Sequence, residues 1–333
     1  MVSQSTDNFK ILKTFWEELL QLGITKHEVF SKAQLPITIF DETVSANTVQ
    51  FFAIWRAFSE LVNEPSTSVI KLIKNKKTSQ LSPIVLSSYH APNYREALNR
   101  LSRYKQLCTP ERILISEEGE NCTIEFEWLY SDLPEPSMLS SYLMAFLVEI
   151  GRRGTGKHLV ARHVEFLDPI NDLKGLEDYF GCPIQIGAKR NRLTLLRSDL
   201  DTTFISYNAE LLDILTPALD RSLDEQKSKN SISEIVKEII KQHLTGGRPK
   251  IQDISKELCI SERTLQRKLS DSGTNFNKLL NEARHEKAKE YLKNETLEIK
   301  EVAFMLGYDD QNSFFRAFKL WERTTPSNWR ANN

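Results

Sequence analysis

The last hundred residues contain the same hydrophobic pattern twice. Residues 254–261 (ISKELCIS) align with residues 302–309 (VAFMLGYD) at an offset of 48 positions. After one extra residue in the second copy, residues 265–269 (LQRKL) align with residues 314–318 (FFRAF). Apolar residues recur at helical spacing on both sides of each short break, so each copy predicts a helix, a tight turn and a second helix. The whole region 232–330 is therefore expected to be helical.

Small residues and helix caps stand where a helix-turn-helix motif needs them. Two short helices that cross closely need a small residue and a tight turn, which Ala303 and Gly307 provide in the second copy. Ser261 is a good N-cap for the helix that follows it, in which leucines four positions apart share one face. The two motifs are expected at about residues 251–272 and 299–321.

The opposite faces of the two second helices carry side chains that can read DNA. In the major groove, arginine suits guanine and phosphate, whereas glutamine and asparagine suit adenine. A plain helical bundle with solvated polar positions needs neither the repeated turn nor these polar sets, so it is the weaker interpretation. The residues expected to contact DNA are Arg263, Thr264, Gln266, Arg267, Gln311, Asn312, Ser313 and Arg316.

A long helix is expected between the two copies, where an apolar stripe runs from Phe276 to Leu292. About 18 residues at 1.5 Å each span ~27 Å. Such a rod could hold the two DNA-reading helices roughly one DNA turn, ~34 Å, apart, so that both enter successive major grooves. Before the first copy, Gly247-Arg248-Pro249 predicts a helix that starts at Pro249 or, alternatively, a basic arm that reaches a minor groove.

The C-terminal segments closely resemble one family. Residues 307–319 (GYDDQNSFFRAFK), followed by Thr325-Pro326 and Trp329-Arg330, resemble the C-terminal signature of the AraC/XylS transcription regulators. Residues 261–269 (SERTLQRKL) resemble the first recognition helix of one subgroup of that family. The resemblance covers about residues 232–330. It implies that the two recognition helices contact bases of double-stranded DNA while the rest of the module grips phosphates.

The same resemblance implies partners and a mode of control. It implies contact with RNA polymerase, most often as an activator, and a homodimer. It also implies an N-terminal domain that binds a small effector, mediates dimerisation, or does both. The N-terminal half here resembles the subgroup with a longer, mixed α/β domain more than the β-barrel of the sugar-sensing prototype.

Three positions depart from the family pattern. Cys259 stands where the first turn usually has glycine, and Ser255 stands where alanine is preferred. Arg323 replaces the usual glycine after the last recognition helix, where a left-handed residue is expected. We expect these departures to cost a few tenths to ~1 kcal/mol of local stability and to leave the fold unchanged.

The first 223 residues predict a mixed architecture. Phe9, Leu12 and Leu20 fall on one face of an expected first helix. Apolar and polar residues alternate over residues 122–128, which predicts a half-buried strand with residues 112–115 as its hairpin partner. Further strands are expected at 160–166 and 193–196, and further helices at 138–150, 173–180 and 207–223. An aromatic set at helical spacing fits a core better than a pocket: Phe51, Phe52, Trp55, Phe58, Trp128, Tyr142 and Phe146.

The chain therefore predicts a multidomain α+β protein. A mixed α/β regulatory domain is expected over residues 1–223, and an all-α DNA-binding domain with two helix-turn-helix motifs over residues 232–330. The polar stretch 224–231 (DEQKSKNS) between them predicts a linker. The net charge is +3 over residues 231–333 and −4 over residues 1–230, which allows a nucleic-acid partner at the C-terminal end without requiring one.

Composition predicts a cytoplasmic protein without a membrane span. The longest apolar run, residues 142–150, is far shorter than the ~20 residues that cross a bilayer. The N-terminus is polar and contains no apolar signal segment. The four cysteines have no metal-ligand spacing, which fits reduced thiols.

No pattern in the sequence predicts an enzyme, a metal site or a cofactor. Residues 151–157 (GRRGTGK) match a phosphate-binding loop, but His158 stands where Mg²⁺ needs a hydroxyl, and a helix precedes the segment where a strand is required. A basic glycine turn is expected there instead. Some regulators with this DNA-binding module are fused to a DNA-repair methyltransferase, which needs a reactive cysteine in a Pro-Cys-His context. Cys182 precedes Pro183 and lacks that context. A small effector of unknown identity is left open.

Two hypotheses about function follow. The first is a sequence-specific transcription regulator, an activator by resemblance, controlled by its N-terminal domain through an effector or dimerisation. The alternative is a protein-interaction module, in which the N-terminal domain binds a partner protein and the DNA-binding half serves localisation.

Overall fold

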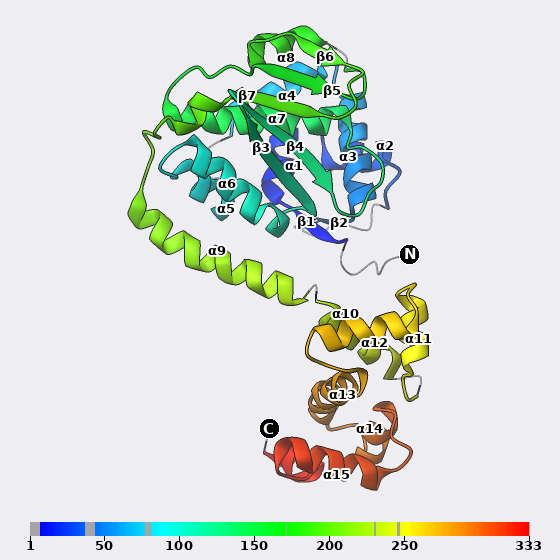
Figure 1. The fold of residues 1–333 in the computed structure, drawn as a ribbon. Coiled ribbons are helices and arrows are strands. Elements are labelled where there is room, and N and C mark those ends of the chain that lie inside the picture. Colours follow the sequence, from blue (N-terminus) through cyan, green and yellow to red (C-terminus); the bar gives the residue numbers. More distant parts are fainter. Residues whose placement is uncertain are drawn as a thin grey trace. The chain divides into compact units, whose positions relative to one another are not determined.

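The chain forms two compact units, one from Asp7 to Leu223 and the other from Asp224 onward (Figure 1). The computed structural model describes residues 7–36, 44–76, 81–170, 172–229, 231–244 and 247–332. The first unit combines helices and strands, and the second is helical throughout its described residues. The expected α+β class, with a mixed unit followed by a helical one, is confirmed. Within the described ranges, no helix is both long enough and apolar enough to cross a membrane.

A five-stranded sheet forms the centre of the first unit, in the order β3-β4-β7-β5-β6. Neighbouring strands are antiparallel except β5 and β6, which are parallel. The hairpin expected around residues 112–128 is confirmed, and Gly119 makes its turn with a φ of 58°. The strands are β3 (Glu111–Glu118), β4 (Asn121–Trp128), β5 (His163–Phe166), β6 (Ile184–Ile186) and β7 (Arg192–Leu196).

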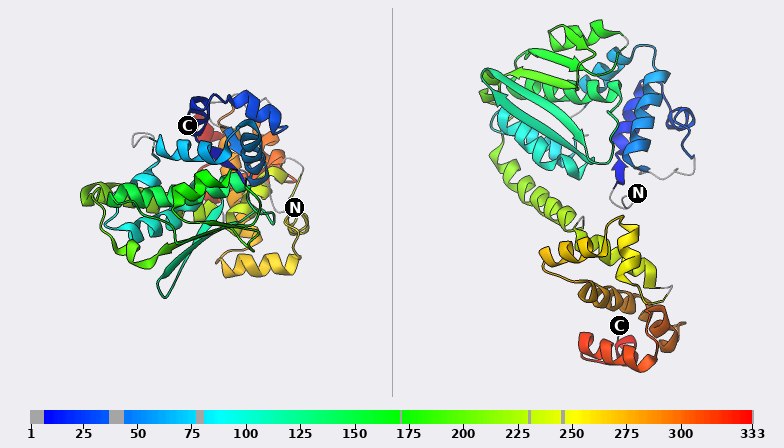
Figure 2. Two further views of the ribbon diagram at one scale, coloured as in Figure 1. Left: turned by 90° about the horizontal axis from the view of Figure 1, so that it is seen from above. Right: turned by 45° about the vertical axis from the view of Figure 1, so that its right-hand side comes forward.

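One face of this sheet packs on helices, and the other face carries charged side chains. In Figure 2 the helices of this unit lie on one side of the strands. Because side chains alternate along a strand, Cys122 of β4 and Leu193 of β7 are fully buried on that side. On the other face Arg192 pairs with Glu125 and Glu165, with N–O distances of 2.9 and 3.4 Å. Arg190 also pairs with Glu125, with an N–O distance of 2.8 Å, so two arginines face these two carboxylates.

Several helices of the first unit begin at recognisable caps. Thr25 caps α2 and Asn47 caps α3, each in a reciprocal capping box. Pro65 and Pro83 occupy the first positions of α4 and α5, where a missing N–H costs nothing. The helices are α1 (Lys13–Gln21), α2 (Lys26–Lys32), α3 (Thr48–Leu61), α4 (Pro65–Lys74), α5 (Pro83–Tyr89), α6 (Tyr94–Tyr104), α7 (Ser137–Thr155), α8 (Leu173–Phe180) and α9 (Ala209–Lys229).

The N-terminal segment differs from its expected helix. Phe9 belongs to strand β1 (Phe9–Ile11), which pairs with β2 (Val44–Ala46). Leu12 and Leu20, expected on the buried face, are exposed. The strand pairing that displaces the helix joins segments far apart in the chain, so the local periodicity did not reveal it.

The glycine turn expected over residues 151–157 is wrong, because helix α7 continues through most of it. Only Gly156, directly after the helix, is left-handed, with a φ of 67°. A Cβ atom on Gly154 would lie 2.4 Å from the ring of Phe204, and one on Gly151 would collide with a tyrosine ring. These two glycines therefore serve close helix packing, and the strand-loop-helix geometry of a phosphate site is missing here.

Helix α9 extends beyond the helix expected over residues 207–223 and includes most of the expected linker. Its last residues, 224–229, are polar, which predicted a break. Glutamate, glutamine and lysine are nevertheless good helix formers, so polarity alone did not end the helix. Asp220 of α9 accepts hydrogen bonds from Arg103 and Tyr104 of α6, at 2.9 and 2.7 Å.

The buried side of α9 faces the first unit. Leu219 and Leu223 belong to its hydrophobic core, and Leu212 is also buried. Leu211 and Leu215 are half-buried. Leu212 therefore packs within the unit rather than forming a free face.

The second unit is a set of short helices around one core. Its buried apolar residues come from every helix of the unit, and include Val236, Leu265, Leu292 and Phe314. The helices are α10 (Ile232–His243), α11 (Ile251–Glu257), α12 (Glu262–Asp271), α13 (Phe276–Leu292), α14 (Ile299–Met305), α15 (Gln311–Glu322) and α16 (Pro326–Ala331).

Candidate nucleic-acid interface

The first helix-turn-helix consists of α11 and α12. Ser261 caps α12, because its hydroxyl oxygen accepts the backbone N–H of Thr264 at 3.1 Å. Leu265 and Leu269 are buried on one side of α12, as their four-residue spacing predicts. The cap fixes where the helix begins, and the two leucines fix which face it turns to solvent.

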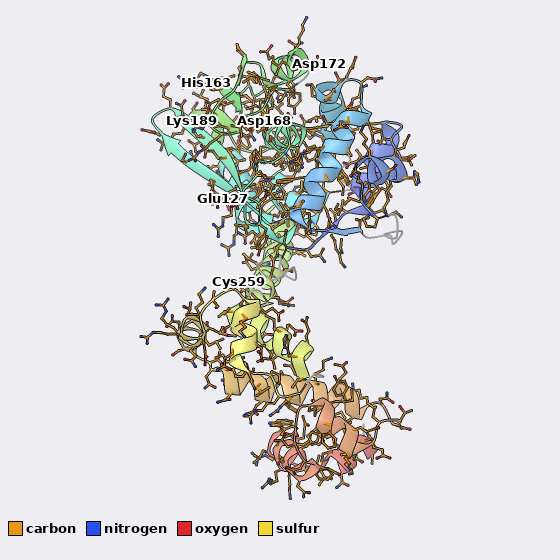
Figure 3. The ribbon with its side chains drawn as sticks, turned by 90° about the vertical axis from the view of Figure 1, so that its right-hand side faces the viewer. Glu127, His163, Asp168, Asp172, Lys189 and Cys259 are labelled. Atoms are coloured by element: carbon orange, nitrogen blue, oxygen red, sulfur yellow. The ribbon has the colours of Figure 1, made fainter. Side chains whose placement is uncertain are left out.

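The first motif contains two of the three departures from the family pattern, Ser255 in α11 and Cys259 in the turn. Cys259 is exposed and left-handed, with a φ of 54°, so it adopts the conformation that the usual glycine would supply (Figure 3). Ser255, in place of the preferred alanine, is buried. Its hydroxyl donates to the carbonyl of Gln252 at 3.0 Å, so the buried oxygen is satisfied.

The second motif consists of α14 and α15, joined at Gly307, whose φ is 68°. Asp310 caps α15. Its carboxylate accepts the backbone N–H of Ser313 at 2.8 Å and the hydroxyl of Ser313 at 2.7 Å. These hydrogen bonds lower the pKa of the Asp310 carboxyl. At the other end of α15, Arg323 is left-handed with a φ of 59°, as expected for the position that usually holds glycine.

The predicted DNA-contacting residues lie on the outer sides of α12 and α15. The apolar faces of these helices point into the same core. Thr264 and Ser313 are half-buried and take part in the two helix caps. The other six are exposed: Arg263, Gln266, Arg267, Gln311, Asn312 and Arg316. Exposure makes these six side chains available, and their contact with DNA stays a prediction.

Glu262 organises the start of α12. It is half-buried, and its carboxylate accepts amide hydrogens from Gln252 at 3.0 Å and Gln266 at 3.4 Å. Its place in the first helical turn also suits a negative charge, because the helix dipole is positive there. Glu262 therefore links α11 to α12 and orients the amide of a predicted base contact.

Arg284 of α13 fastens the second motif to the connecting helix. It is buried, and its guanidinium donates to the carbonyls of Leu306 and Gly307 at 2.9 and 2.6 Å. It also lies 4.3 Å from the ring centroid of Tyr308. Burial lowers the pKa of Arg284. This role of Arg284 was not predicted from the sequence, although an arginine within an apolar stripe is a signal that could have identified it.

The segment before α11 does not begin a helix at Pro249, since α11 starts at Ile251. Pro249 is buried and Arg248 is exposed. A Cβ atom on Gly307 would lie 2.8 Å from the carbonyl oxygen of Gly247 and 3.2 Å from Cα of Arg248. The backbone of this segment therefore packs directly against the second turn.

The first unit contains a cleft of about 410 Å³. It is lined by residues of α3, the first turns of α4 and α7, the segment before α7 and the loop after β5. The aromatic set singled out in the sequence does not line it and instead belongs to or packs on the core, as its spacing predicted. Across the described ranges, no group of three or more His, Cys, Asp or Glu residues could hold a metal ion.

Comparison with known proteins gives matches over both units. Residues 23–204, more than half of the chain, match the family described as the arabinose-binding domain of AraC transcription regulator, N-terminal. Residues 254–332 match a helix-turn-helix domain family. An uncharacterized HTH-type transcriptional regulator of Mycobacterium tuberculosis is 28% identical over 170 residues, 51% of this chain and 48% of that protein. The match thus spans about half the length of that relative.

Two further similar proteins match over more of the chain. The HTH-type transcriptional regulator VirS of Mycobacterium tuberculosis is 23% identical over 258 residues, which cover 75% of this chain and 74% of VirS. The crystal structure of the transcriptional regulator CdpR from Pseudomonas aeruginosa covers 95% of this chain and 98% of its own, with 20% identity and a TM-score of 0.44.

Proposed function

Because the chain belongs to the AraC family of transcription regulators, we propose that it binds DNA sequence-specifically by inserting α12 and α15 into successive major grooves. One observation carries this proposal. Two capped helices turn their apolar faces into one core and leave six polar side chains exposed on their outer sides. We assign DNA binding to residues 232–330 and regulation to residues 1–223, and no catalytic step is involved.

We propose that the first unit controls DNA binding through a small effector, through homodimerisation, or through both, in the cytoplasm. The cleft of about 410 Å³ supports the effector role, because small-molecule sites are concave and of this size. We propose further that the protein activates transcription by contacting RNA polymerase. Sedimentation would test the dimer, and in vitro transcription with purified polymerase would test activation.

The decisive experiment measures binding of the full chain to DNA upstream of its own coding sequence at several salt concentrations. The variants Arg267→Ala and Arg316→Ala remove one exposed guanidinium from each proposed reading helix. Arg221→Ala is the matched control, since it removes an exposed guanidinium from α9. A scrambled duplex of equal length measures non-specific binding.

We expect the natural sequence to be preferred, and each of the two substitutions to cost ~1–3 kcal/mol of that preference while the control leaves it unchanged. Equal effects of all three substitutions would contradict the assignment of α12 and α15 as readers. Complete lack of salt-dependent binding would favour the alternative, a protein-interaction module.

A further inference from the structure

The cleft of the first unit has a buried carboxylate at its wall. Glu135 lines the cleft, and only 6% of its surface is exposed. Its Oε1 atom accepts hydrogen bonds from the Ser140 hydroxyl at 3.0 Å and from the Asn191 side-chain amide at 2.9 Å. Asn191 is itself held, because its own oxygen accepts the backbone N–H of Leu167 at 2.8 Å. The carboxylate is therefore fixed in position.

The donors to Glu135 are both neutral, so its charge lacks a counter-charge. Among the residues that the structure describes, no lysine, arginine or histidine forms an ion pair with Glu135, and Oε2 has no hydrogen-bond partner. A buried charge is normally paired, because desolvation without compensation is costly. Since Glu135 lines the cleft, Oε2 is the oxygen left for a bound molecule.

The half-buried Lys105 already has a partner. Lys105 pairs with the fully buried Glu111, with an N–O distance of 2.5 Å. Burial raises the pKa of the Glu111 carboxyl, and the negative charge of Glu135 raises it further.

The rim of the cleft adds a second free carboxylate. Asp168, on the loop after β5, is exposed and has no ion pair within the described ranges (Figure 3). Glu60 is already paired with Lys32 at 2.8 Å. Arg56 lies over the ring of Phe52, 6.0 Å from its centroid, and forms no ion pair with the cleft carboxylates. The cleft therefore presents the carboxylates of Glu135 and Asp168 on one side and the exposed guanidinium of Arg56 on another, and the two carboxylates are the acceptors available to a bound molecule.

We propose that this cleft binds a small organic ammonium ion, with the ammonium group paired to Oε2 of Glu135 and close to Asp168. The inference rests on the proposed effector role of the first unit and names the chemical class of that effector. A primary amine supplies the missing positive charge and N–H donors, and its apolar part contacts the Val69, Met138 and Ile170 side chains that also line the cleft.

Calorimetric titration of the full chain at neutral pH tests the proposal with three probes of one shape. These are n-butylammonium chloride, butan-1-ol and sodium butyrate, compared at equal ionic strength. We expect saturable binding of the ammonium ion alone. Absence of saturable ammonium binding, or equally tight binding of the alcohol or the carboxylate, overturns the proposal.

The substitution Glu135→Gln removes the negative charge of the side chain but can keep its hydrogen bonds. The amide oxygen of glutamine can still accept from Ser140 and Asn191, while a neutral donor replaces Oε2. We expect n-butylammonium to bind about tenfold more weakly or worse, since a hydrogen bond to a charged group is lost. Glu118→Gln is the matched control, because Glu118 is exposed on β3 outside the cleft, and it should bind like the unaltered chain.

A second variant covers the case in which Glu135→Gln fails to fold. Asp168→Asn changes an exposed side chain and should fold normally, with several-fold weaker ammonium binding. Unchanged affinity in Asp168→Asn and in any folded Glu135→Gln refutes the site. DNA binding of the same preparations without amine is measured separately. If DNA binding persists while ammonium binding is absent, only this inference is wrong. If DNA binding itself is absent, the proposed regulator function is wrong.

Discussion

Residues 259 and 307 occupy equivalent places in the two turns, but substitutions there should have opposite effects. Both residues are left-handed, with φ values of 54° and 68°. Cys259 is exposed, so Cys259→Gly removes a side chain that has no packing role in the core. Gly307→Ala instead places a Cβ atom 2.8 Å from the backbone oxygen of Gly247, which cannot yield like a flexible side chain.

The magnitudes follow from two backbone terms and one packing term. A left-handed conformation costs an L-residue ~1–2 kcal/mol, and glycine loses ~0.4–1 kcal/mol relative to alanine through unfolded-state entropy. Cys259→Gly should therefore stabilise the second unit by at most ~1.5 kcal/mol. In Gly307→Ala the left-handed conformation of alanine is destabilising, and the lower entropy of the unfolded chain partly offsets it. A forced backbone shift adds ~1–3 kcal/mol, so the substitution should destabilise the second unit by about 1–4 kcal/mol.

Amide hydrogen exchange of the full chain measures both effects, since it resolves one unit of a two-unit protein. Peptides from α11 and α12 report on Cys259→Gly, and peptides from α14 and α15 report on Gly307→Ala. We expect slower or unchanged exchange in Cys259→Gly and clearly faster exchange in Gly307→Ala. The reasoning is refuted if Gly307→Ala leaves the exchange rates unchanged, or if both substitutions accelerate exchange equally.

Three further predictions concern single interactions. Arg284→Met should destabilise the second motif by about 2–3 kcal/mol, because two backbone carbonyls lose a charged donor; normal exchange protection of α15 would contradict this. The pKa of Glu322 is held low by its hydrogen bond with His285, so its stabilising contribution is present above the ordinary pKa and lost as the pH falls through the lowered one. The Tm difference between the unaltered chain and Glu322→Gln should thus be complete well above the ordinary glutamate pKa of ~4.3 and shrink as the pH falls below it, and a constant difference would argue against it. Asp220→Ala should increase amide exchange in α9 several-fold, since Tyr104 loses its acceptor, and unaltered exchange would exclude this anchoring role.

The second unit was largely predictable because its signals are local. The repeat, the Ser261 cap and the leucine spacing each act within one or two helical turns, and the family resemblance they supported is confirmed. Arg284 escaped prediction because its partners are backbone carbonyls of another helix end. A sequence does not reveal which carbonyls remain free until the helices are packed.

The first unit was predictable where a single segment carries its own pattern, as in the expected strands that correspond to β5 and β7. The β3–β4 hairpin was predicted, since its strands are joined by a tight turn. The short strands β1, β2 and β6 were missed, because three residues are too few to show an alternating pattern. Gly154 was misread as a turn residue, since only the packed Phe204 ring reveals why its Cβ must be absent. The Glu135 cleft likewise combines segments that no sequence window contains together.

The length of helix α13 determines the direction in which α15 faces as well as its distance from α12. Each residue added to an α-helix rotates everything beyond it by about 100° and advances it by ~1.5 Å. Neighbouring base pairs differ by only about 35° around the DNA axis. A single insertion between Phe276 and Leu292 would therefore turn α15 away from the groove it is proposed to enter, and no nearby base-pair spacing could compensate. Under the proposed function, α13 should tolerate many substitutions in evolution but almost no change in length.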